Sequence, residues 1–355
     1  MQDIQKIIEI HENFWERKPT TRPLNNYRIA EDFFFAAHFE EIKPLLIPGK
    51  EIFPHMLDVD LLLKDYENHF QEIQKIDQQA FWSAEPYTGI PWMEGILGCS
   101  IFASDKSFVS KPTGVKAEDI KEITFDHKNE WYLKYIEFCT KLTKLSGGRF
   151  PVAQPIMRGP SDMTGAILGQ GEMLYAILRD KEMVKAIFEQ VTDVFLEVIN
   201  GQYQATKDFH GGYSVGFYRV WAPGKVIWFQ EDLTAILSPT LYRELLKGCA
   251  EKICRDYPYT AFHIHPSSFF IVDDLLEVEG LKAIEVNKDV GGPSVKEMMG
   301  VFKKIIQKKC LIIWGDLDEE DIDCIKRELP NTGLYLNIIV ESAERARQLQ
   351  DYIDK

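Results

Sequence analysis

The sequence lacks the features that mark membrane, secreted and nucleic-acid-binding proteins. No apolar run approaches the roughly 20 residues that cross a bilayer, and the first residues have no apolar core of the kind found in a secretory signal. Basic residues form no block, and the net charge is -14. Without a membrane span or a secretory signal, the chain is expected to be cytoplasmic. Because an acidic chain is repelled by phosphates, we expect it to bind neither nucleic acid nor a membrane.

Paired cysteines and a glycine-rich phosphate loop are also missing. The six cysteines are scattered without a CxxC pair, which favours reduced thiols over a disulfide framework. No G-x-G-x-x-G follows any predicted strand, so dinucleotide binding has no support. With 355 residues, of which 45% are hydrophobic, the chain has an ordinary globular composition and shows no internal repeat.

Short apolar stretches alternate with helical ones after residue 149. Before that point, a long helix predicted at 115–146 ends at Gly147-Gly148, a typical helix stop. Alternating β and α units require a parallel sheet, and about eight strands is the number in a (β/α)₈ barrel. The predicted strands cover residues 150–157, 213–218, 225–229, 261–265, 283–286, 310–314 and 334–340, with further candidates near 26–29 and 81–83.

We therefore predict an α/β fold, a TIM-type (β/α)₈ barrel with an N-terminal helical extension. The chain is expected to form a single domain over 1–355, with a mainly helical portion at 1–80 and the barrel strands and helices at 81–355. A doubly wound open sheet is the alternative. The stretch 218–228 also reads as two strands around a Pro-Gly turn, which is typical of a hairpin at the rim.

Two histidines one residue apart are the strongest functional signal. His263 and His265 lie in a predicted strand that ends at Pro266. Side chains alternate along a strand, so both imidazoles point to the same side. Two converging imidazoles suit a metal, a proton transfer or an anionic substrate. Two buried, hydrogen-bonded histidines without a ligand are the alternative.

Polar residues follow several predicted strands, where the chemistry of a barrel is found. A buried lone carboxylate is costly unless it is paired or binds a cation, so this accumulation indicates a site. Arg158 is expected at the barrel mouth, where it either grips an anionic substrate group or holds Asp162 in place. The predicted catalytic residues are Arg158, Asp162, Glu231 and Asn337.

An early segment, residues 82–99, is rich in aromatic residues, glycine and proline. Ordered loops of this kind often carry binding residues. We expect Trp82, Tyr87 and Trp92 to roof one cavity. The predicted substrate-binding residues are Trp82, Glu85, Tyr87, Trp92 and Tyr218.

Four segments in this order along the chain resemble the uroporphyrinogen decarboxylase superfamily. They are FWERKPTTRP at 14–23, MRGPSD at 157–162, LSP at 237–239 and the late His-x-His strand. The superfamily includes uroporphyrinogen decarboxylase and the methyltransferases that move methyl groups between corrinoid proteins and thiols. The resemblance spans roughly residue 5 to the end and implies a (β/α)₈ barrel.

The resemblance also implies a ligand set. The methyltransferase branch binds zinc through a His-x-Cys strand end, sometimes a glutamate on the next strand, and a cysteine near the last strand. Here His263 and His265 stand at the first position and Glu285 at the second, while the last strand offers Asn337 and Glu341 and no cysteine. A set of His263, His265, Glu285 and Glu341 suits a divalent metal, with zinc as the leading candidate.

The leading functional interpretation is a methyltransferase with this metal as a Lewis acid. Its corrinoid would be carried by a separate partner protein, because the chain has no Asp-x-His-x-x-Gly run. One alternative is a metal-free decarboxylase or lyase of a small aromatic or heterocyclic acid, in which Arg158 holds the carboxylate and Asp162 or a histidine handles the proton. Another is a non-catalytic barrel that binds a ligand. The substrate is a small molecule in both enzyme readings, and a homodimer stays open.

Overall fold

A six-stranded parallel sheet forms the centre of the protein. The computed structural model describes residues 4–29, 39–74, 78–120 and 122–354. Apart from the strand at 24–29, whose sequence is LNNYRI, the strands are mostly apolar, as expected for parallel strands buried on both faces. In spatial order they are β1 (Leu24–Ile29), β11 (Leu334–Val340), β10 (Cys310–Gly315), β9 (Ala283–Asn287), β8 (Tyr259–Ile264) and β7 (Val226–Gln230).

The sheet continues toward a barrel and remains open on one side. Beyond β7, Arg158 forms a single parallel bridge with Gln230, and Val152 forms another with Ala84. No pairing among the described residues joins the Ala84 segment to β1. Prolines at 151 and 155 lack the N–H that a continuous ladder needs, which explains the isolated bridges. The predicted parallel α/β fold is confirmed, and the described residues do not form a closed eight-stranded barrel.

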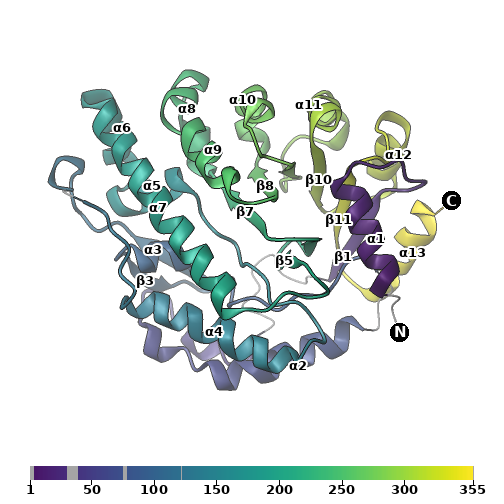
Figure 1. Cartoon of the computed structure of the whole chain (residues 1–355), viewed down its shortest axis with the longest axis horizontal. Helices are drawn as coiled ribbons and strands as arrows, with labels where there is room; N and C mark the ends of the chain where they lie inside the picture. Colours follow the sequence, from purple (N-terminus) through teal and green to yellow (C-terminus); the bar gives the residue numbers. More distant parts are fainter. Residues whose placement is uncertain (1–3, 30–38, 75–77, 121, 355) are drawn as a thin grey trace.

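Helices cover the outside of the sheet (Figure 1). Most follow a strand and lead to the next one, and they pack through apolar faces at helical spacing. In α11, for example, Val295, Met298 and Phe302 are buried. The helices are α1 (Ile4–Trp15), α2 (Val59–Ile73), α3 (Trp92–Ile96), α4 (Glu130–Ser146), α5 (Pro160–Leu168), α6 (Gln170–Arg179), α7 (Lys181–Ala205), α8 (Pro239–Leu245), α9 (Lys247–Arg255), α10 (Val272–Glu277), α11 (Val295–Lys308), α12 (Glu319–Glu328) and α13 (Ala343–Ile353).

Two local predictions need correction. The helix predicted at 115–146 begins only at Glu130, because the Asn129 side chain accepts a hydrogen bond from the Tyr132 N–H and caps the helix there. The stretch predicted as a strand at 213–218 is shorter: β5 (Tyr213–Val215) pairs antiparallel with β6 (Val220–Ala222). The hairpin therefore turns at residues 216–219, and not at the Pro-Gly pair that follows β6.

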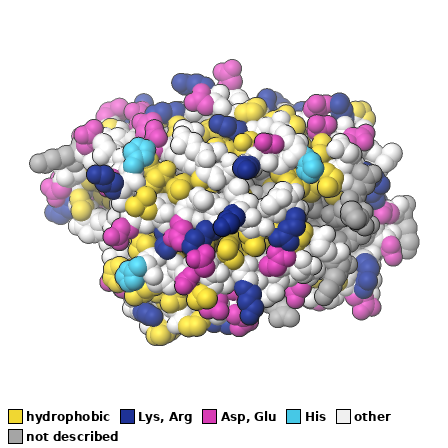
Figure 2. Space-filling view, turned by 60° about the horizontal axis from the view of Figure 1, so that its bottom comes forward, with side chains coloured by type: hydrophobic (Ala, Val, Ile, Leu, Met, Phe, Trp, Pro, Cys, Tyr) yellow, Lys and Arg dark blue, Asp and Glu magenta, His cyan; other side chains and the backbone are white. Residues whose placement is uncertain are grey.

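The rest of the molecule is built around this core. A small antiparallel sheet of β2 (Glu51–Ile52), β3 (Ser100–Ala103) and β4 (Phe108–Lys111) lies near α3. Figure 1 places α1 beside β1 and α13, with both chain ends on that side. Over the face drawn in Figure 2, basic side chains lie among acidic ones. Within the described part of the chain, no helix has the length and apolarity to span a bilayer.

Candidate metal centre

A cavity of about 320 Å³ lies at the carboxyl ends of β7, β8 and β9. Strand β8 contributes His263, and His265 follows the end of the same strand. The loop after β7 contributes Asp232. All three side chains line the cavity, and the alternation of side chains along β8 explains why both imidazoles face it.

The ligand atoms of these three residues converge. Asp232 Oδ1 lies 3.8 Å from His263 Nε2 and 3.8 Å from His265 Nε2. The three atoms lie within 4.8 Å of one another. Ligands of one tetrahedral metal with bonds of about 2.0–2.2 Å lie roughly 3.3–3.5 Å apart, so the two distances from Asp232 Oδ1 exceed this separation by only a few tenths of an ångström.

One carboxylate oxygen of Asp232 has no hydrogen-bond partner among the described residues. Asp232 Oδ2 accepts a hydrogen bond of 2.7 Å from Gln230 Nε2, whereas Oδ1 is buried and has no hydrogen-bond partner in the described chain. A buried carboxylate oxygen without a partner is costly unless a cation compensates it. The residues present therefore fit a divalent metal ion.

A carboxylate contacts the Nδ1 atom of each imidazole, on the side of the ring away from Asp232. His263 Nδ1 contacts Glu285 Oε2, and His265 Nδ1 lies 2.6 Å from Asp289 Oδ1. Asn287 Nδ2 donates to the same Asp289 oxygen over 2.6 Å. With each Nδ1 engaged, each Nε2 is turned toward Asp232, which is the arrangement that orients histidine ligands in metal proteins.

This geometry changes the role predicted for Glu285. The sequence placed Glu285 among the metal ligands. The strand register pairs it directly with His263, so its carboxylate contacts Nδ1 of His263 and is not part of the group formed by Asp232 and the two Nε2 atoms. Glu285 is fully buried behind the ring, on the side away from Nε2. Burial alone would lower the pKa of His263, but Glu285, Asp232 and Asp289 outweigh it and raise the pKa to about 9.

Two residues predicted as catalytic support the Asp232 loop instead of lining the cavity. Asp162 accepts hydrogen bonds from the backbone N–H groups of Asp232 (3.1 Å) and Leu233 (2.8 Å). Glu231 accepts one from the Ser161 N–H over 2.7 Å. Burial and the neighbouring Asp232 raise the pKa of Asp162 to about 7, and burial raises that of Glu231 well above its usual range.

Arg158 lines the cavity, but its partner differs from the predicted one. Its Nη1 donates to Glu94 Oε1 over 2.6 Å, whereas Asp162 is engaged with the backbone. Glu94 is only 1% exposed, while the Arg158 side chain is 46% exposed at the cavity. Arg158 therefore neutralises a buried carboxylate on α3 and keeps part of its guanidinium accessible.

Asn337 and Glu341 lie outside the cavity. Asn337 is buried, accepts a hydrogen bond of 2.8 Å from Asn26 Nδ2 and donates one of 2.9 Å to the Tyr218 carbonyl. It thus fixes the β5–β6 turn, from which the Tyr218 ring enters the cavity with its hydroxyl 3.5 Å from His263 Nδ1. Glu341 is exposed at the end of β11 and does not belong to the ligand group.

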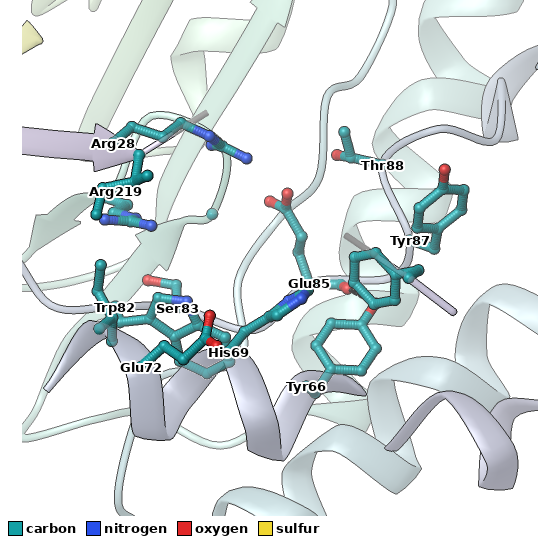
Figure 3. Close-up of a pocket in the computed structure, with 14 residues that line it drawn as sticks. Arg28, Tyr66, His69, Glu72, Trp82, Ser83, Glu85, Tyr87, Thr88 and Arg219 are labelled. Carbon is teal, nitrogen blue, oxygen red and sulfur yellow. Dashed lines mark hydrogen bonds between the residues drawn. The ribbon is translucent and has the colours of Figure 1, made fainter. Parts of the chain in front are cut away.

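The predicted aromatic roof is divided between two cavities. Tyr87 and Trp92 line the metal cavity, although Trp92 also packs edge-to-face against Trp131 in the helical layer. Trp82 and Glu85 line a neighbouring cavity of about 190 Å³, which shares Tyr87 with the first (Figure 3). Asp232 is the ligand candidate that the sequence did not single out, although it stands directly after a predicted strand and Glu231.

Comparisons with known proteins give a full-length match of fold alone. No family model and no curated protein matches the chain. A methyltransferase from Methanosarcina mazei superposes with a TM-score of 0.63 at 13% identity, over 98% of each chain. The chain shares the fold of that protein. Two mannanases are too distant to carry an argument. A β-mannanase from a symbiotic protist of the termite Reticulitermes speratus has a TM-score of 0.39 at 12% identity, over 80% of this chain and 90% of that one. A mannanase from Bacillus subtilis has a TM-score of 0.37 at 12% identity, over 98% of this chain and 88% of that one.

Proposed function

We propose that this chain is a methyltransferase that holds a divalent metal on Asp232, His263 and His265 and acts with a separate corrinoid-carrying protein. The observation that carries the proposal is the unpartnered Asp232 Oδ1, which lies 3.8 Å from both Nε2 atoms. The full-length likeness in fold to a methyltransferase supports the reaction class. The resemblance of the sequence to the uroporphyrinogen decarboxylase superfamily points in the same direction.

The donor set favours zinc. Two imidazoles and one carboxylate are accepted zinc ligands, and three protein ligands leave a fourth position open for a substrate. The same set also suits iron, cobalt or nickel by ligand type. When bound, the ion supplies Lewis acidity, which lowers the pKa of a heteroatom at the open position. All six cysteines are buried and none lines the cavity, so a thiolate ligand has no source here.

The other residues of the cavity would position the reactants. Glu285 and Asp289 fix the two imidazoles, and Asp162 fixes the loop of Asp232. The rings of Tyr87 and Tyr218 line the same cavity and give it an apolar wall beside the metal group. A preorganised site of this kind needs little rearrangement when the reacting atoms meet.

Metal content and methyl transfer are measured together to test the proposal. The parent protein is loaded with zinc, desalted and analysed by mass spectrometry, and then mixed with methylcobalamin and a panel of small thiols. We expect one equivalent of metal and methylation of a thiol. Asp232→Asn and His265→Ala should lose both, whereas His127→Ala, which alters an exposed histidine, should keep both.

The outcomes separate the alternatives. Metal binding without methyl transfer would retain the metal centre and reject the reaction. A metal-free protein that releases carbon dioxide from a small aromatic acid would establish the lyase, which the half-exposed guanidinium of Arg158 could serve. In that case Arg158→Gln should abolish activity, while Asp162→Asn should act mainly on stability. If the protein neither binds a metal nor turns over any of these substrates, the ligand-binding alternative is the one that remains.

A further inference from the structure

Asn287 lies at the carboxyl end of β9, in the wall of the metal cavity. It follows Glu285 by two positions, so the two side chains lie on the same face of the sheet. On one side, the strand register pairs Asn287 with Trp314 of β10. On the other side, Nδ2 of Asn287 lies 3.4 Å from Nδ1 of His265. Asn287 therefore stands between a metal-ligand candidate and an aromatic residue, both of which line the cavity.

The amide oxygen of Asn287 is buried and has no hydrogen-bond partner in the described part of the chain. The whole residue is only 4% exposed. Its Nδ2 donates to Asp289 Oδ1 over 2.6 Å, so the nitrogen of the amide is satisfied and the oxygen is not. An amide oxygen that loses water without gaining another donor destabilises the fold. A ligand in the cavity that supplies a donor would remove this cost.

The chemistry of Asp289 determines which way the amide is turned. An ionised carboxylate only accepts hydrogen bonds, and the same Asp289 oxygen also lies 2.6 Å from Nδ1 of His265. Turning the Asn287 amide over would place its oxygen against the carboxylate oxygen, and two acceptors repel each other. Asp289 thus holds Nδ2 and keeps Oδ1 at the opposite edge of the amide. Because Oδ1 only accepts, the group that meets it must carry an O–H or an N–H.

Aromatic rings form much of the cavity wall beside this oxygen. Phe217, Tyr218 and Trp314 line the cavity, and the Trp314 ring packs against Phe217 at 5.4 Å and against Tyr218 at 5.8 Å. One polar group of the wall is already engaged, since Gln230 Nε2 donates to Asp232 Oδ2. Sites for small molecules combine such apolar walls with a few fixed polar groups, and the polar groups set the specificity.

We propose that Asn287 Oδ1 selects small thiols that carry a hydroxyl or an amine N–H near the sulfur. The inference rests on the proposed function, which places the sulfur at the open position of the metal. With the sulfur there, a donor elsewhere on the same small molecule satisfies the amide oxygen in the adjoining wall. An analogue without the donor leaves this buried acceptor unpaired, which is the most effective way for a site to reject it.

Two thiols of similar size test the inference. 2-Mercaptoethanol carries a hydroxyl where 1-propanethiol carries a methyl group. Both dissociation constants are measured by calorimetry on the zinc-loaded full chain, without corrinoid, in the parent and in Asn287→Leu. Leucine has a similar volume and accepts no hydrogen bond. We expect the variant to weaken mercaptoethanol binding at least about fivefold relative to propanethiol binding.

The ratio of the two constants separates recognition from support of the fold. Asn287→Leu also removes the hydrogen bond to Asp289, but a weakened His265 affects both thiols alike and cancels in the ratio. Asp289→Asn, which alters the support of His265 and keeps the Asn287 oxygen, should leave the ratio unchanged. Asn200→Leu, at an exposed position of α7 that does not line the cavity, is the matched control and should change neither constant. Equal weakening of both thiols in Asn287→Leu would overturn the inference.

Failure of the proposed function would look different. A zinc-loaded protein that shows the change in ratio but transfers no methyl group would retain the role of Asn287 and reject the reaction. If the chain binds no zinc, the metal centre fails, and the same ratio is measured on the metal-free chain by ligand-observed NMR at millimolar thiol. A metal-free chain that does not bind mercaptoethanol, or whose ratio is the same in the parent and Asn287→Leu, would overturn the inference as well.

Discussion

Replacement of the two carboxylates behind the histidines should weaken metal binding to different degrees. Glu285→Gln removes a carboxylate that is fully buried, whereas Asp289→Asn removes one whose side chain is 32% exposed. A buried charge-assisted hydrogen bond contributes about 1.5–3 kcal/mol. Exposure to solvent reduces such a contribution to about 1 kcal/mol.

These energies convert into a measurable difference. At about 1.4 kcal/mol for each factor of ten, Glu285→Gln should raise the Kd for zinc about 10- to 150-fold, and Asp289→Asn about fivefold. Loss of orienting carboxylates in known metal sites costs about 10–100-fold, which is the same range. The assay is competition with a chromophoric chelator on protein stripped of metal. Glu277→Gln, on an exposed pair with Lys247, serves as the control.

The size of the effect decides between two roles of Glu285. If Glu285 were itself a ligand, its replacement should match Asp232→Asn and His263→Ala, which we expect to cost more than about 1000-fold. X-ray absorption should then show one oxygen fewer around the zinc. An unchanged Kd in Glu285→Gln, or a loss equal to that of Asp232→Asn, would refute the orienting role.

Three further predictions concern stability and its coupling to the site. Gly159→Ala should destabilise the protein by about 1–3 kcal/mol and weaken zinc binding. The added Cβ would lie 2.6 Å from the Gln230 carbonyl oxygen, which precedes the Asp232 loop. Urea unfolding measures the first effect, and the chelator assay measures the second. Arg158→Gln should cost about 1–2 kcal/mol, since it leaves the buried Glu94 unpaired, and an unchanged melting temperature would contradict this pairing. Burial lowers the pKa of His11 to about 4 in the folded state, so the unfolded chain binds the proton first and stability falls as the pH drops from 6.5 to 4. The contribution of His11 to this loss between pH 7 and pH 5 should be about 2 kcal/mol, measured as the difference between the parent and His11→Phe in how the free energy of unfolding changes over that range.

The parallel sheet could be predicted because its strands are apolar runs bounded by helices. The stretches at 225–229, 261–265, 283–286, 310–314 and 334–340 correspond to β7 to β11. The open side was less predictable. The stretch 150–157 has the apolar character of a strand, but its two prolines restrict it to isolated bridges. The apolar residues thus predicted where the segment lies, whereas the two prolines, which lack a backbone N–H, determine how it pairs.

The candidate site could be located from the sequence, but the roles within it could not be assigned. Strand alternation places His263 and His265 on one side of β8, and register places Glu285 beside His263. Which carboxylate meets Nδ1 and which meets Nε2 depends on side-chain geometry that spacing does not encode. The sequence also could not predict the partner of Arg158, because Glu94 is 64 residues away along the chain, on helix α3.

The unpartnered Asp232 Oδ1 has a consequence for the stability of the whole fold. Asp232 Oδ2 accepts a hydrogen bond from Gln230 Nε2, and the Asp232 backbone N–H donates to Asp162 Oδ2, so both the side chain and the loop are held in place. A buried carboxylate oxygen without a partner destabilises the fold. A cation that satisfies this oxygen should therefore stabilise the folded protein, and the gain in free energy of unfolding should grow with the concentration of the metal.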